Sequence, residues 1–119
     1  MGRVLIADDE PEVTVLLDEI LGEWGYEVAT VATGAEALSI ATTFQPHVIV
    51  IDMAMPRLSG PEVVPALRRQ GLTAPVIFIT GNEFAQPEGC FAVVSKPFDF
   101  RRLAEVMSAA MAESQATTA

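Results

Sequence analysis

Short apolar runs alternate along the chain with longer stretches in which apolar residues recur at helical spacing. Residues 48–51 (Val-Ile-Val-Ile) and 76–79 (Val-Ile-Phe-Ile) are apolar at every position, which is typical of strands buried on both faces of a sheet. Three further segments complete the set. The pattern predicts five strands, at residues 3–7, 27–31, 48–51, 76–79 and 91–94.

Helices are predicted between these strands. Residues 11–22 place five apolar side chains on one helical face, those of Val13, Leu16, Leu17, Ile20 and Leu21. Pro11 suits the first turn of this helix, and Gly22 and Gly25 mark its end. Residues 34–44, 60–70 and 98–112 repeat the pattern, whereas the tail after residue 113 is expected to be frayed.

This alternation predicts an α/β fold, in which a doubly wound, five-stranded parallel sheet carries helices on both faces. The chain has 119 residues, which fits one domain, so residues 1–119 are assigned to a single domain. One connection is short. Residues 80–90 include Gly81, Pro87 and Gly89, so we expect a loop with at most one turn of helix there.

Charge and cysteine content narrow the possible partners. Seven Lys and Arg residues stand against sixteen Asp and Glu residues, which gives a net charge of −9. Because nucleic-acid binding depends on neutralising phosphates with cations, nucleic acid is an unfavourable partner. The apolar run at residues 4–7 is too short for a signal peptide or a membrane span, and Cys90 is the only cysteine. We therefore expect a cytoplasmic protein without a membrane partner.

Polar residues that could bind a ligand or take part in a reaction follow the predicted strands. Asp8 and Asp9 follow the first strand, and Asp52 follows the third. Thr80 follows the fourth strand, and Lys96 lies just past the fifth. The carboxyl ends of parallel strands share one edge, where ligands bind. Neighbouring acids repel one another unless a cation lies among them, and Mg²⁺ prefers such oxygen ligands.

An ordinary interpretation exists for each of these residues alone. An aspartate after a strand is more often a helix cap than a metal ligand, a lone lysine is usually a surface residue, and a lone threonine is usually a turn residue. Their co-occurrence at four strand ends favours a Mg²⁺-dependent site in which Asp52 accepts a phosphoryl group.

Four motifs carry a resemblance to a known family. They are Ile6-Ala7-Asp8-Asp9-Glu10, Asp52-Met53-Ala54-Met55-Pro56 running on to Ser59-Gly60, Ile79-Thr80-Gly81 and Lys96-Pro97-Phe98. In this order and spacing they resemble the response-regulator receiver domains of two-component signalling, chemotaxis regulators among them, over nearly the whole chain. The resemblance implies the flavodoxin-like strand order 2-1-3-4-5, which is already known for such receivers.

The resemblance also implies the role of each site residue. Asp52 would accept a phosphoryl group from a histidine kinase or a histidine phosphotransfer protein. Asp9 and Asp52 would bind Mg²⁺ directly, Asp8 would bind it through water, and the backbone carbonyl of Ala54 would complete the protein ligands. Thr80 and Lys96 would contact the phosphoryl group, and the peptide bond before Pro97 would be cis.

Two departures from the family bear on the output of the domain. The segment between Thr80 and Lys96 is short by about two helical turns, so the fourth helix of the family should be reduced or absent. Val93 occupies the position of the aromatic residue that commonly acts as a switch, and Phe91 is two residues away. We expect intact phosphorylation chemistry, with output through contact with an unidentified downstream protein and not through DNA. The oligomeric state is left open.

Three alternative functions fit the sequence less well. An aspartyl-phosphate phosphatase would need a second acid two residues after Asp52, where Ala54 stands. A flavodoxin-like cofactor carrier would need phosphate donors in the first loop, where the run Asp8-Asp9-Glu10 repels phosphate. An interaction domain without phosphorylation is disfavoured because no residue of the site is missing. The chain is expected to be a phosphoacceptor and not an enzyme.

Overall fold

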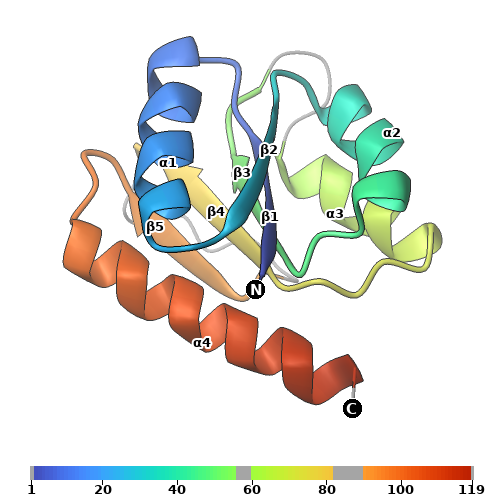
Figure 1. Cartoon of the computed structure of the whole chain (residues 1–119). Coiled ribbons are helices and arrows are strands. Elements are labelled where there is room, and N and C mark those ends of the chain that lie inside the picture. The colour runs from blue at the N-terminus through green and yellow to red at the C-terminus, as the bar shows by residue number, and fades with distance from the viewer. Residues whose placement is uncertain (1, 56–59, 82–89, 119) are drawn as a thin grey trace.

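The computed structural model describes residues 2–55, 60–81 and 90–118, with side chains as far as Ser114 (Figure 1). The strands are β1 (Arg3–Ala7), β2 (Glu27–Val31), β3 (Val48–Asp52), β4 (Val76–Thr80) and β5 (Ala92–Ser95). The helices are α1 (Pro11–Glu23), α2 (Gly34–Phe44), α3 (Gly60–Arg69) and α4 (Phe100–Thr118). All neighbouring strands are parallel, in the order β2-β1-β3-β4-β5, which confirms the predicted topology.

Helices cover both faces of the sheet, as the alternation predicted. α1 and α4 pack on one face, where Leu17 and Leu103 are fully buried against strand residues such as Ile6. α2 and α3 pack on the other face, where Ala41 and Leu67 belong to the second core cluster. Figure 1 shows the sheet between these two helix pairs. Every residue of β3 and β4 is buried, which explains why those strands are apolar almost throughout.

The end of the chain is helical. α4 continues to Thr118, and fraying of the tail after residue 113 stays a prediction. Ser114 is buried, with 5% of its surface exposed, so α4 still packs against the protein at this residue. Asp99 starts the helix, because its Oδ1 accepts hydrogen bonds from the backbone N–H groups of Arg101 (3.0 Å) and Arg102 (3.4 Å).

Two further expectations concern the segment before Lys96. Strand β5 begins at Ala92, one residue later than predicted, so Phe91 lies outside the strand with 36% of its surface exposed. The predicted reduction of the fourth helix concerns residues 82–89, which lie outside the described residues. Among the helices that the structure describes, none is both long and apolar enough to cross a membrane.

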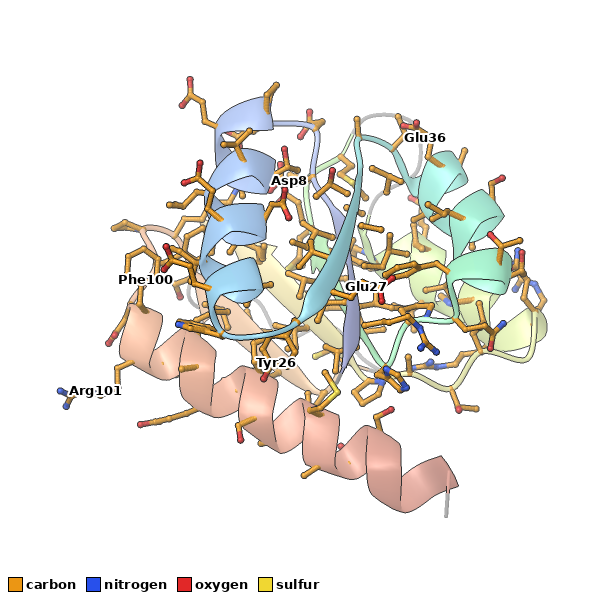
Figure 2. All side chains as sticks on the ribbon, viewed as in Figure 1. Asp8, Tyr26, Glu27, Glu36, Phe100 and Arg101 are labelled. Atoms are coloured by element: carbon orange, nitrogen blue, oxygen red, sulfur yellow. The ribbon has the colours of Figure 1, made fainter. Side chains whose placement is uncertain are left out.

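The register of the sheet places the chemistry-bearing residues at one edge. Asp8 follows the last residue of β1, and Asp52 and Thr80 are the last residues of β3 and β4. Thr80 pairs with Ser95, and Lys96 comes directly after it. Asp8 therefore lies at the upper end of the sheet in Figure 2, whereas Tyr26 lies at the opposite end, beside α4.

Candidate functional site

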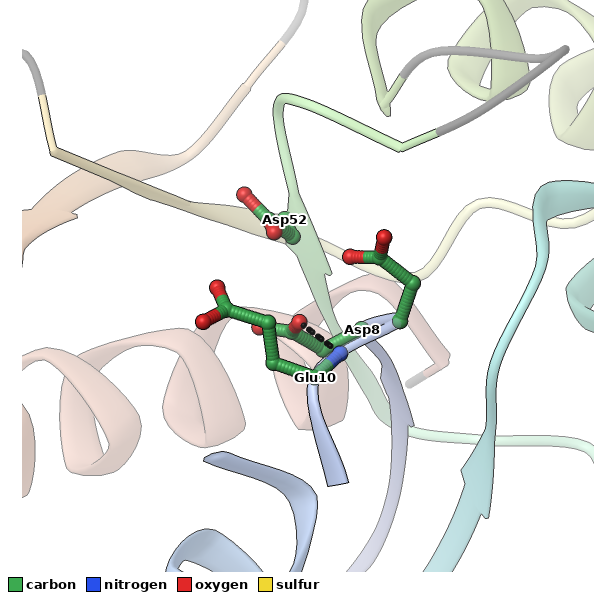
Figure 3. Close-up of side chains that lie close together, drawn as sticks. Asp8, Glu10 and Asp52 are labelled. Atoms are coloured by element: carbon green, nitrogen blue, oxygen red, sulfur yellow. Dashed lines mark hydrogen bonds between the residues drawn. The ribbon is translucent and has the colours of Figure 1, made fainter. Parts of the chain in front are cut away.

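Four carboxylates converge at the carboxyl edge of the sheet. Asp8 and Asp52 are buried, with 1% and 4% of their surfaces exposed, whereas Asp9 and Glu10 face solvent. One oxygen from each of the four lies within 4.8 Å of the others. Figure 3 shows the side chains of Asp8, Glu10 and Asp52 grouped above the ends of the strands. The structure thus brings together the three acids that the sequence predicted, and adds Glu10.

Backbone amides hold the two buried carboxylates in place. The N–H of Glu10 donates to Asp8 Oδ1 at 2.9 Å (Figure 3), and the N–H of Ala54 donates to Asp52 Oδ1 at 3.2 Å. Each contact joins an aspartate to the residue two positions later, which is the geometry of an Asx turn. In both residues the second oxygen, Oδ2, is left for the pocket.

Lys96 is the cation of the site. Its Nζ lies 2.8 Å from Glu10 Oε1 and 3.5 Å from Oδ2 of both Asp8 and Asp52. The backbone positions it, because the N–H of Lys96 donates to the carbonyl oxygen of Thr80 at 2.8 Å. The Lys96–Pro97 peptide bond is cis, as the resemblance implied. Thr80, which is buried, is thereby joined to the lysine at the edge of the sheet.

The electrostatics of the pocket are unbalanced towards negative charge. The pKa of Asp8 is raised from 3.8 to about 6, chiefly by burial and also by the charges of Asp52 and Glu10, while the Glu10 N–H and Lys96 oppose the rise. For Lys96, burial alone would lower the pKa. The hydrogen bond to Glu10 and the surrounding carboxylates outweigh that effect and raise it. The lysine therefore stays charged, and the acids still exceed it.

The pocket fits a hard divalent cation. Asp8 Oδ2 is buried and has no hydrogen-bond partner among the described residues, and its nearest cationic neighbour is Lys96 Nζ at 3.5 Å. A buried carboxylate oxygen without a partner is costly, and a cation would remove that cost. Carboxylate oxygens from several residues with room for water are the ligands that Mg²⁺ prefers. Asp8, Asp9 and Asp52 would hold the ion. That the backbone carbonyl of Ala54 is a further ligand of the ion stays a prediction.

Gly60 supports the site from behind, and the sequence did not reveal this. In the sequence, Gly60 indicates only the start of a predicted helix. A Cβ atom at this position would lie 2.6 Å from the carbonyl oxygen of Asp52 and 2.9 Å from Cε1 of Phe78. Only glycine therefore allows the first turn of α3 to pack directly against the strand end that carries Asp52.

Sequence reasoning also missed Glu10 as a member of the site. The acidic run Asp8-Asp9-Glu10 was the available signal, but nothing local shows that the third acid reaches Lys96. Val93, at the position of the family's aromatic switch, is half-buried against the cluster formed with α2 and α3. Phe91, exposed before β5, does not take its place in the strand.

Comparison with known proteins gives the family. The model for the response regulator receiver domain matches residues 4–108 of the chain. This match covers most of the sequence. The parallel sheet and the acidic pocket at its carboxyl edge agree with it. The chain belongs to the family of response regulator receiver domains of two-component systems.

Individual relatives agree with this assignment. The chain is 40% identical over 81 residues to the alkaline phosphatase synthesis transcriptional regulatory protein PhoP of Bacillus subtilis, covering 68% of this chain and 34% of that protein. It is 38% identical over 104 residues to the transcriptional regulatory protein KdpE of Mycobacterium tuberculosis, covering 82% and 46%. The chain thus spans less than half of the length of these relatives.

A solved structure is similar over nearly its full length. The response regulator protein TrrA of Thermotoga maritima is 32% identical, with a TM-score of 0.84 over 92% of this chain and 99% of that one. TrrA was solved in complex with Mg²⁺-BeF.

Proposed function

We propose that Asp52 accepts a phosphoryl group from a histidine kinase or a histidine phosphotransfer protein in a reaction that depends on Mg²⁺. In this reaction a carboxylate oxygen of Asp52 forms a bond to phosphorus as the phosphorus–nitrogen bond of a phosphohistidine breaks. The imidazole nitrogen keeps the electron pair, and the histidine leaves neutral after taking up a proton. The product on this chain is an acyl phosphate.

One observation carries the proposal. Asp52 is buried at the end of β3, with the ammonium of Lys96 3.5 Å from its Oδ2 and oxygens of three other acids within 4.8 Å. A carboxylate confined in this way can attack an incoming phosphorus atom, because its other oxygen is already held by the Ala54 N–H. The Mg²⁺-BeF complex of the related protein TrrA supports the same use of the pocket.

The other residues of the pocket serve the charge that develops during transfer. When bound, Mg²⁺ neutralises charge on the phosphoryl oxygens. Lys96 would donate a charge-assisted hydrogen bond to one of these oxygens, and the Thr80 hydroxyl would donate to another. Asp8 and Asp9 would orient the ion. The chain assists its own modification in this account, and we propose that it is a phosphoacceptor and not an enzyme.

The output would be a change in affinity for a protein partner. The net charge of −9 disfavours DNA binding by this domain itself. PhoP and KdpE are named as transcriptional regulators, but the part of each that matches this chain is 34% and 46% of the whole. We therefore propose that this domain transmits its signal by protein contact.

Labelling with a small-molecule phosphodonor tests the function. Acetyl phosphate with Mg²⁺ should add one phosphoryl group to the wild-type chain, measured by intact mass, and excess EDTA should prevent it. Asp52→Asn should remove the labelling. Asp18→Asn is the matched control, because Asp18 is an exposed acid on α1 outside the pocket.

Two results would contradict the proposal. Equal labelling of Asp52→Asn and wild type would move the acceptor to another residue. Equal labelling with and without EDTA would show that the reaction does not depend on the metal. Asp18→Asn should behave as wild type in both conditions, so a general effect of charge on the reaction would appear in this control.

A further inference from the structure

Glu10 occupies the N-cap position of α1 but does not cap the helix. Its backbone carbonyl accepts hydrogen bonds from the N–H groups of Val13 (3.0 Å) and Thr14 (3.2 Å), so the backbone serves the helix. Its side chain makes no capping hydrogen bond. Side chains at this position commonly bond to the first amides of the helix, and Asp, Asn, Ser and Thr are preferred for that reason. The glutamate side chain is directed elsewhere.

That side chain makes the shortest contact of Lys96. The distance from Lys96 Nζ to Glu10 Oε1 is 2.8 Å, whereas the distances to Asp8 Oδ2 and Asp52 Oδ2 are 3.5 Å. The two residues are 86 positions apart in the sequence. Glu10 is also the outermost of these acids, because 59% of its side chain is exposed compared with 0% for Asp8 and 6% for Asp52. The ammonium is thus held at the mouth of the pocket.

We propose that Glu10 is a positioning residue that holds Lys96 at the mouth of the pocket before phosphorylation and releases it to the phosphoryl group afterwards. This inference rests on the proposed function of Asp52. With the ammonium held by Glu10, the Oδ2 atoms of Asp8 and Asp52 are left for the cation. An aspartyl phosphate then brings additional negative charge next to the lysine, and its oxygens attract the ammonium more strongly than one exposed carboxylate.

The proposal predicts a measurable competition. Glu10→Gln keeps a hydrogen-bond acceptor of the same size but loses the charge that holds Lys96. Its affinity for beryllofluoride, a phosphoryl mimic, at saturating Mg²⁺ should be tighter than that of wild type by about two- to five-fold, the range expected for a partly exposed ion pair. Glu12→Gln is the matched control, since Glu12 is an exposed acid on the first turn of the same helix, and its affinity should not change.

A second measurement follows the lysine itself. Lys96 is the only lysine in the chain, so protein labelled with ¹³C- and ¹⁵N-lysine gives one side-chain signal by NMR. In the metal-free protein this signal should differ between wild type and Glu10→Gln, and should be the same in wild type and Glu12→Gln. After addition of Mg²⁺ and beryllofluoride, the signals of wild type and Glu10→Gln should coincide, because the ammonium then contacts the mimic in both.

The outcomes separate the possible failures. If Glu10→Gln binds beryllofluoride more tightly while its free lysine signal matches wild type, the effect is general electrostatics and the positioning role is wrong. If the wild-type lysine signal does not move on binding, release from Glu10 does not occur. If wild type binds no beryllofluoride, the proposed function of Asp52 fails, whereas the free-state signals still test the contact with Glu10.

Discussion

Both ends of the sheet carry charged residues, but these residues find different hydrogen-bond and ionic partners at the two ends. At the carboxyl edge, four carboxylates share one ammonium, and Asp8 Oδ2 has no hydrogen-bond partner among the described residues. At the amino edge, the guanidinium groups of Arg3 and Arg68 donate hydrogen bonds to backbone carbonyl oxygens. The two edges belong to the same strands, so the difference lies in how the charges are used.

At the amino edge, two arginine side chains donate hydrogen bonds to backbone carbonyl oxygens. Arg3 Nε donates to the carbonyl oxygens of Phe44 (2.9 Å) and Gln45 (3.0 Å) at the end of α2. Across the edge, Arg68 Nη1 donates to the carbonyl oxygens of Leu72 (3.0 Å) and Ala74 (2.9 Å), in the segment that leads into β4. These guanidinium groups fasten loops to the fold.

The two edges differ in which charges are available for a ligand. Charges that end on backbone carbonyls stabilise the protein as it stands. Carboxylates left to repel one another reduce the stability of the metal-free protein, and that cost is recovered only when a cation binds. We therefore expect the carboxylates at the carboxyl edge to lower the stability of the metal-free protein, and we expect no such cost at the amino edge.

The largest expected effect comes from neutralising the least satisfied acid. Asp8→Asn should raise the free energy of unfolding at pH 8 in EDTA by up to about 3 kcal/mol, which corresponds to the pKa difference between 3.8 and about 6. Asparagine can keep the hydrogen bond from the Glu10 N–H to Oδ1. Urea unfolding of both proteins measures the difference, and lower stability of the variant at pH 8 would contradict the comparison.

The same variant predicts a pH dependence. The pKa of Asp8 is higher in the folded protein than in the unfolded chain, so protonation favours the folded state. Wild type should gain stability as the pH falls from about 6 to about 4, and the advantage of Asp8→Asn should shrink across that window. Added Mg²⁺ at pH 8 should stabilise wild type more than the variant. Asp18→Asn, on the exposed face of α1, should show neither effect.

Gly60→Ala tests whether the acidic edge depends on close packing behind it. The added methyl group would meet the carbonyl oxygen of Asp52 at 2.6 Å, so the strand end or the helix must move. We expect a loss of about 1–3 kcal/mol in unfolding free energy and weaker phosphoryl labelling. Gly22→Ala is the control, because nothing lies within 4 Å of its added Cβ, and it should gain about 0.5–1 kcal/mol. If a stable Gly60→Ala protein were labelled as wild type, the site would not depend on the close packing of Gly60 behind Asp52.

Arg3→Ala tests the amino edge. Loss of the Nε hydrogen bond, which is shared between two carbonyl oxygens, should lower the unfolding free energy by about 1–2 kcal/mol. Mg²⁺ affinity, measured by calorimetry, should stay unchanged, because the pocket lies at the other end of the strands. Arg101 points into solvent from α4 (Figure 2), and Arg101→Ala should leave both quantities unchanged. A changed Mg²⁺ affinity in Arg3→Ala would show that the two edges are not independent.

The smallest effect is expected at His47. Its Nδ1 accepts a hydrogen bond from the backbone N–H of Arg3 at 2.9 Å, and burial, followed by the positive charges of Arg3 and the amino terminus, lowers its pKa. Because the folded-state pKa is lower than the value of about 6.5 in the unfolded chain, the contribution of His47 is present above that pH and is lost as the pH falls.

Replacement by glutamine should remove this loss. Comparing unfolding of wild type and His47→Gln at pH 7.5 and pH 5.5 cancels the opposite contribution of Asp8, which is present in both proteins. Wild type should lose more stability than His47→Gln between the two pH values. Equal losses would mean that the histidine is not restrained by Arg3.

The sequence predicted the sheet and most of the site because both depend on local signals. A run such as residues 48–51, apolar at every position, indicates a strand buried on both faces, and the residue after such a strand must lie at the carboxyl edge. Asp8, Asp52, Thr80 and Lys96 could therefore be placed at one edge before their distances were known.

The remaining features depend on contacts between distant segments. The pairing of Glu10 with Lys96 and the approach of Gly60 to Asp52 require the tertiary structure, since neither residue type indicates its partner. The burial of Ser114 on α4 also depends on the tertiary structure, because a serine in a polar segment does not indicate a buried position. The one-residue shift of β5 was likewise set by its pairing with β4.

The most direct test of the central claim is to identify the residue that carries the phosphoryl group. Four carboxylates lie close enough for any of them to be the acceptor in principle. Borohydride reduces an aspartyl phosphate to homoserine, so treatment after reaction with acetyl phosphate and Mg²⁺ marks the acceptor for peptide mass spectrometry. The account predicts homoserine at position 52 alone. Homoserine at position 8 or 9, or no conversion at any aspartate of a protein that has gained a phosphoryl group, would contradict it.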